Sequence, residues 1–101
     1  MTKQLDVLKE EFRPQAQRPD DLFLLSANDA ANFVRRGNSL GGRLAGIEGF
    51  KKTVGGAYQP QQEFSNDAAD ARSTEAFVSD TLLLIEKGGL EGLLFQVVFE
   101  Q

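Results

Sequence analysis

The chain has 101 residues and a formal net charge of −4, and it contains neither histidine nor cysteine. This length is typical of one domain, and the ordinary apolar content argues against wholesale disorder. Without cysteine and histidine, the chain itself can form no disulfide, no thiolate or imidazole metal site and no Ser-His-Asp triad. We therefore expect no cofactor, no metal ion and no enzymatic activity, with catalysis by carboxylates alone as the remaining enzymatic alternative.

The N-terminal region shows no sign of membrane targeting. Its first twelve residues are charged throughout, and the longest apolar runs of the chain cover only Leu22–Leu25 and Leu82–Ile85. A signal peptide needs an apolar segment of about 7 to 15 residues, and a membrane span needs about 20. The sequence thus predicts a cytoplasmic protein that does not contact a membrane.

Residues 1–21 are expected to form a helix and a linker ahead of a single domain at 22–101. Leu5, Leu8 and Phe12 recur at the spacing of one helix face. The dipeptide Arg13-Pro14 ends this helix, because the residue before a proline avoids helical backbone angles. The polar stretch that follows predicts a linker.

A short strand and a helix are expected next. Leu22–Leu25 is a continuous apolar run, which is typical of a strand buried on both faces. Ser26 is suited to cap the following helix, and Gly37-Asn38 to end it. The apolar face of this helix would consist of Ala30, Phe33 and Val34.

The middle of the chain predicts two antiparallel strands. The first covers Arg43–Val54, and two glycines inside it indicate a bulge. Gly55-Gly56 predicts a two-residue hairpin turn. The returning strand, Ala57–Ser65, contains Pro60, which marks it as an edge strand.

The last third predicts a helix followed by a strand. Ser73 would cap the helix and Gly88-Gly89 would end it. In the strand Leu93–Glu100, alternate residues make one wholly apolar face. Such a strand is either central in its own sheet or an edge that pairs with a second copy of the chain.

The expected order is an extra N-terminal helix followed by β-α-β-β-α-β. This order predicts an α+β two-layer sandwich. The ferredoxin-like strand order is one arrangement that fits it. The ferredoxin-like order places the third strand in the centre of the sheet. In this chain the third strand is the most polar, whereas the first and last strands are the most apolar and look central.

The charges are distributed unevenly along the chain. From residue 30 to residue 62, five basic residues stand against one acidic residue, and from 63 to 101 two basic residues stand against eight acidic ones. The acidic last third favours a basic protein partner, and its candidate contact residues surround an expected loop at 66–72: Glu63, Asp67, Asp70 and Glu75. The acidic total disfavours nucleic acid. The alternative is a small-molecule-sensing or regulatory module that binds an anionic ligand through Arg35, Arg36 and Arg43. Such a module could act as a monomer or as a homodimer.

Four stretches resemble small bacterial proteins of the toxin-immunity type: Leu22–Gly37, Leu44–Phe50, Gln59-Pro60 and Asp67. The resemblance covers about half of the chain and implies a compact α+β protein that binds and blocks a toxin. Together with the charge distribution, it predicts a non-enzymatic bacterial binding protein. We expect an inhibitor or immunity protein that captures a basic partner, such as a toxin, through its acidic surface.

Overall fold

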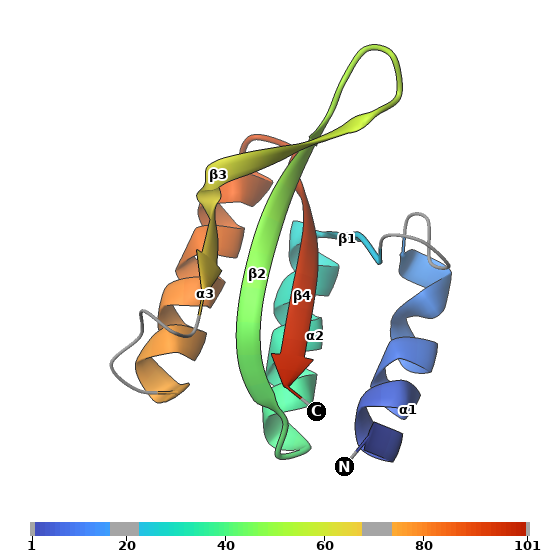
Figure 1. The fold of residues 1–101 in the computed structure, drawn as a ribbon, viewed down its shortest axis with the longest axis vertical. Helices are drawn as coiled ribbons and strands as arrows, with labels where there is room; N and C mark the ends of the chain where they lie inside the picture. Colours follow the sequence, from blue (N-terminus) through green and yellow to red (C-terminus); the bar gives the residue numbers. More distant parts are fainter. Residues whose placement is uncertain (1, 17–22, 68–73, 101) are drawn as a thin grey trace.

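The part of the chain that the structure describes forms three long helices and a four-stranded antiparallel sheet (Figure 1). A computed structural model describes residues 2–16, 23–67 and 74–100. Its elements are α1 (Thr2–Phe12), η1 (Arg13–Gln15), β1 (Leu25–Ser26), α2 (Ala27–Ser39), β2 (Arg43–Lys52), β3 (Tyr58–Asp67), α3 (Thr74–Gly89) and β4 (Leu94–Glu100). The predicted order of an extra helix followed by β-α-β-β-α-β is confirmed.

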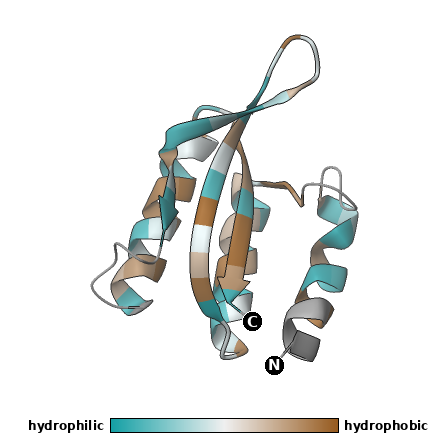
Figure 2. Ribbon diagram, in the orientation of Figure 1, coloured by the Kyte–Doolittle hydropathy of each residue, from teal (hydrophilic) through white to brown (hydrophobic). Residues whose placement is uncertain are grey.

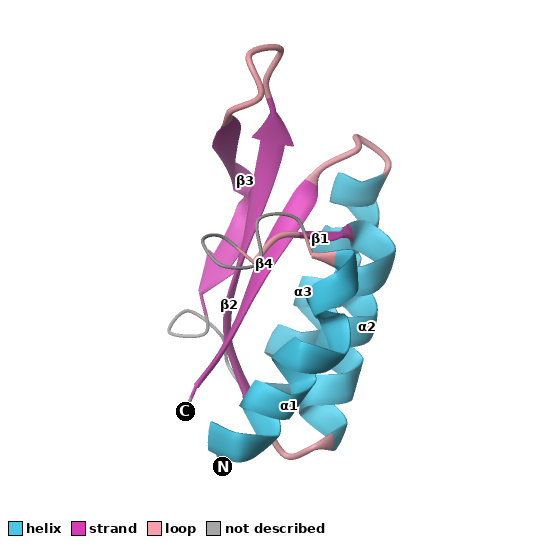
Figure 3. Cartoon of the chain, turned by 90° about the vertical axis from the view of Figure 1, so that its right-hand side faces the viewer, coloured by secondary structure: helices cyan, strands magenta, loops and turns pink. Residues whose placement is uncertain are grey.

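The helices and the sheet form two layers. The three helices lie on one side of the sheet, and no helix of the described residues covers the other side, which we call the open face (Figure 3). Between the layers lies a core to which the three α-helices and the strands contribute; its buried members include Leu8, Leu25, Phe33, Ile47, Phe77, Ile85 and Phe95. The predicted α+β two-layer class is therefore confirmed.

The spatial order of the strands is β1-β4-β2-β3. The last strand is central and the third is an edge, as predicted, and Figure 2 shows that β3 is markedly hydrophilic along much of its length. The ferredoxin-like order, which needs a central third strand, is therefore not the order of this sheet. Its central pair is β2 and β4, joined in register from Arg43 and Glu100 to Phe50 and Leu94.

The first strand differs from its prediction in both length and position. It spans only Leu25–Ser26 and lies at the edge of the sheet, beside β4. Ser26 explains the short length, because its hydroxyl accepts a hydrogen bond from the Asp29 backbone N–H at 3.4 Å and so begins α2 at once. The predicted burial is nevertheless present, since Leu24 and Leu25 are completely buried.

The second helix continues through Gly37 to Ser39, so the predicted stop at Gly37-Asn38 is wrong. Gly37 is buried, and a Cβ atom at this position would overlap the ring of Phe99 on β4. The glycine thus lets α2 approach the sheet closely instead of ending the helix. Gly41, with φ +84°, provides the left-handed backbone angle in the loop that follows.

The hairpin between β2 and β3 extends beyond the rest of the molecule (Figure 1). Its turn contains three residues instead of the predicted two, because the Thr53 backbone N–H donates to the Ala57 carbonyl at 2.8 Å. Gly56 has φ +87°, which is the angle that three-residue hairpin loops require at their last position. The glycine pair thus indicated the position of the turn correctly but not its length.

The N-terminal helix packs against α2. Leu8 is only 1% exposed, and the rings of Phe12 and Phe33 meet edge to face with their centroids 5.2 Å apart. Glu11 accepts a hydrogen bond from the Arg36 guanidinium at 3.2 Å. The helix expected at the start of the 1–21 segment is therefore part of the folded body, while residues 17–22 of the expected linker lie outside the described residues.

Candidate functional site on the open face

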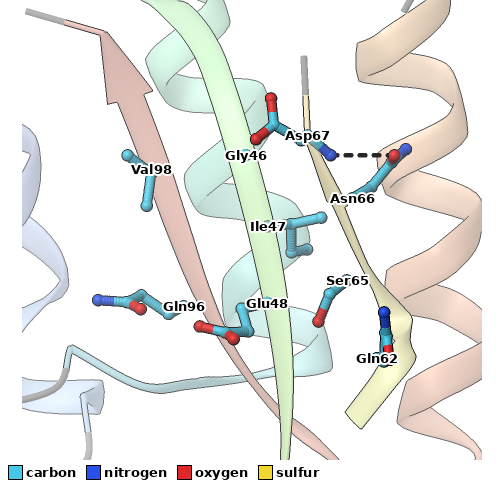
Figure 4. A pocket seen from close by; sticks show the side chains of 9 residues that line it. All are labelled: Gly46, Ile47, Glu48, Gln62, Ser65, Asn66, Asp67, Gln96 and Val98. Carbon is cyan, nitrogen blue, oxygen red and sulfur yellow. Dashed lines mark hydrogen bonds between the residues drawn. The ribbon is translucent and has the colours of Figure 1, made fainter. Parts of the chain in front are cut away.

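The open face of the sheet carries a shallow hollow of about 400 Å³ (Figure 4). Residues 46–48 of β2 form its centre, Gln96 and Val98 of β4 line one side, and Gln62 and residues 65–67 of β3 line the other. The α-helices cover the opposite face of the sheet (Figure 3).

The hollow owes its width to a large irregularity in β3. Asn66 pairs with Ile47 and Gln61 pairs with Gly49, so four residues of β3 lie opposite Glu48 alone. The hydroxyl of Ser65 donates to the carbonyl of Gln61 at 2.9 Å and stabilises this excursion. The extra residues bend the edge strand away from a straight ladder and leave the surface in front of Glu48 open.

Glu48 lies at the centre of the hollow, on the central strand β2. It is partly buried and is paired in register with Gln96, whose side chain lies next to it (Figure 4). Within the described part of the chain, its carboxylate has no hydrogen-bond or ion-pair partner. None of the described residues that line the hollow is basic.

Asp67 supplies a second carboxylate to the hollow. It is exposed at the end of β3, and its register partner is Gly46, which has no side chain to separate it from the middle of the face. Its backbone N–H donates to the Asn66 side-chain oxygen at 3.0 Å, which holds the end of the strand (Figure 4). The hollow therefore combines two negative charges with the amide groups of Gln62, Asn66 and Gln96.

The structure places the predicted acidic residues along one margin of the molecule. Glu63 and Asp67 are exposed on β3, Glu75 is exposed in the first turn of α3, and these two elements contact each other (Figure 1). Asp67 lies in the hollow and Glu63 lies in the irregular part of β3. Asp70 lies outside the described residues.

Each of the three predicted arginines has a side-chain partner in the described structure. Arg36 pairs with Glu11 at 3.2 Å, and Arg43 pairs with Glu100 at 3.3 Å. Arg35 donates to the Asn32 side-chain oxygen at 3.4 Å. An anionic ligand would have to displace a carboxylate from two of the three guanidinium groups.

Glu48 is the site residue that the sequence analysis missed. In the sequence it is the single acid of the basic middle segment, and nothing there connects it with Asp67, 19 positions later. Side chains alternate between the two faces of a strand, and Ile47 lies in the core. This alternation indicates from the sequence that Glu48 lies on the opposite face. No pattern in the sequence indicates that β2 pairs with a kinked β3, and this pairing creates the hollow.

Two further features of the described residues bear on the site. They contain no group of three or more aspartate, glutamate, histidine or cysteine side chains arranged to hold a metal ion. None of the helices within these residues is long and apolar enough to cross a membrane.

Comparisons with known proteins provide no relative for this chain. No family model matches it, and neither the curated proteins nor the solved structures contain a match.

Proposed function

We propose that this protein is a non-enzymatic binding module, of the inhibitor or immunity type, that captures a basic protein partner through its acidic surface. The observation that carries the proposal is the hollow on the open face, which is lined by both Glu48 and Asp67. Glu63 and Glu75 extend this negative surface along β3 and the start of α3. We call the four residues Glu48, Glu63, Asp67 and Glu75 the acidic margin.

Charge of one sign on one side of a protein acts before contact is made. Such a surface raises the association rate of an oppositely charged partner and orients it during the encounter. The exposed members of the acidic margin suit this role, because exposed charges influence rates more than the free energy of the final complex. The polar hollow then provides the place where the oriented partner makes its close contacts.

No catalytic residue is part of this proposal. The hollow is shallow and open to water, whereas acid–base pairs of carboxylates need fixed separations in a site that excludes solvent. Recognition needs only complementary charge and shape, and the open face offers both.

The proposal is tested by affinity capture from an extract of the source organism, with the full chain immobilised. The variant E63K/D67K/E75K reverses three exposed charges of the acidic margin. The matched control D80K/E86K/E91K makes the same change in net charge at three exposed residues of α3 and the following turn. We expect a basic protein to be retained by the wild type and the control and lost from the first variant.

Retention of that protein by all three forms would show that the acidic margin does not bind it. Recovery of only acidic or neutral proteins by the wild type would equally contradict the proposal. Circular dichroism of each variant verifies that the reversal of charge has left the fold intact.

A further inference from the structure

We propose that the hollow receives one arginine side chain of the partner, with the Glu48 carboxylate as its ion-pair acceptor. This inference rests on the proposed function and names the chemical group that the open face recognises. It begins from the environment of Glu48, which is partly buried on a central strand and has no partner among the described residues.

A cationic partner can compensate the Glu48 carboxylate for the water that it loses in this position. Partial burial removes some of the water that solvates the charge, and an opposite charge with hydrogen-bond donors can compensate for that loss. Arg43, at the start of the same strand, is already paired with Glu100 at 3.3 Å. No basic side chain of the described residues is paired with the Glu48 carboxylate, so a cation from a partner can bind it without displacing one.

The other groups around Glu48 favour a guanidinium over an ammonium. The side chains of Gln96, Gln62 and Ser65 also line the hollow, and each carries an oxygen that accepts hydrogen bonds. Arginine offers five donors in one plane, so it can bond a carboxylate and still reach acceptors on either side. Lysine offers three donors around a single point and matches such a spread of acceptors less well.

The shape of the hollow also fits an arginine side chain. Its volume of about 400 Å³ leaves room for the planar head group, and Gly46 contributes no side chain to fill the floor. Val98, which is 47% exposed, provides an apolar wall for the methylene stem. The kink of β3 at residues 62–65 keeps this space open.

The test is a titration of the ¹⁵N-labelled full chain, followed by two-dimensional NMR, with capped Gly-Arg-Gly and capped Gly-Lys-Gly peptides at low ionic strength. We expect saturable shifts with the arginine peptide, confined to the hollow and centred on Gly46, Glu48, Gln96 and Val98. A dissociation constant on the order of 1 mM is reasonable for one side chain. The lysine peptide should bind at least threefold more weakly.

Glu48→Gln removes the charge while keeping the size of the side chain, and we expect it to weaken the arginine peptide at least fivefold. The matched control is Asp80→Asn, an exposed residue of α3, which should leave the affinity unchanged. The same spectra show whether each variant remains folded.

Three results would overturn the inference: shifts spread over all acidic residues without saturation, unchanged affinity in Glu48→Gln, or equal affinity for the two peptides. If a basic partner is still captured through the acidic margin, such a result removes only the arginine assignment. If capture fails as well, the proposed function itself is wrong.

Discussion

At the scale of single residues, Gly37 has a role that its place in the sequence disguises. It lies in a glycine-rich stretch and was interpreted as the end of a helix, but in the fold it is the point where α2 touches the ring of Phe99. Phe99 is only 9% exposed and also packs against Phe33, so its ring has little room to move aside.

We expect Gly37→Ala to destabilise the protein by up to about 2 kcal/mol. Overpacking a filled core costs about 1 to 3 kcal/mol, and the better helix propensity of alanine offsets roughly 1 kcal/mol of this cost. Gly55→Ala is the control, since only one atom approaches its added Cβ, at 4.0 Å, and this position lies in the hairpin turn. Urea denaturation compares the two variants, and equal stability of both would show that α2 and β4 are less tightly packed than described.

Individual site residues were predictable in type but only partly in position. Asp67 was identified from the excess of acid around it, and the structure places it in the hollow. Glu48 was hidden in a basic segment, because charge counted along the chain does not show which residues share one face of a sheet. Of the three predicted arginines, two have carboxylate partners that are distant in sequence: Arg36 with Glu11 and Arg43 with Glu100.

At the scale of elements, α1 shows how a short helix is stabilised by its contacts. It has 11 residues, which is too few for an isolated helix to be stable in water. Its contacts with α2 therefore account for its presence, and among them Leu8 is the side chain most deeply buried.

Truncation of Leu8 to alanine should destabilise the protein by about 2 to 5 kcal/mol, because it leaves a cavity between α1 and the core. Val7→Ala is the control, since Val7 is 62% exposed and its truncation should change the stability by no more than about 0.5 kcal/mol. The free energies are measured by urea unfolding. A loss for Leu8→Ala as small as that of the control would mean that α1 does not dock as described.

The elements themselves were largely predictable, since hydrophobic periodicity and turn residues mark most helices and strands. The serine cap of α2 and the edge character of β3 followed from single residues, Ser26 and Pro60. The length of β1 and the size of the hairpin turn did not, because both depend on hydrogen bonds to neighbouring segments. In the same way, the bulge of β2 was indicated by its glycines, but the larger irregularity of β3 was not.

At the scale of the whole molecule, the distribution of charge matters more than its total. The acidic margin belongs to the open face, β3 and the start of α3, while exposed Lys51 and Lys52 stand in the hairpin that extends beyond the body. A basic partner that approaches the molecule would therefore be attracted by the acidic margin and repelled by the lysines of the hairpin, and both forces would orient it.

This polarity predicts the salt dependence of binding to the captured partner. At about 20 mM salt, E63K/D67K/E75K should lower the association rate at least tenfold, because electrostatic steering can raise such rates by 10 to 10³. At about 0.5 M salt, screening should bring the two rates together, whereas dissociation should change less. Stopped-flow mixing measures both rates, and a gap that persists at high salt would show that the margin acts by contact and not by steering.

The sequence by itself determined the fold class, the order of the elements and the restricted chemistry of the side chains. These follow from local periodicity, turn residues and composition, which do not depend on what lies across the core. Only the tertiary structure decided that β2 and not the first strand lies beside β4 at the centre of the sheet, that Gly37 serves close packing, and that Glu48 and Asp67 share one hollow. Each of these depends on pairing between segments far apart in the chain, and pairing is set by how the apolar faces pack together.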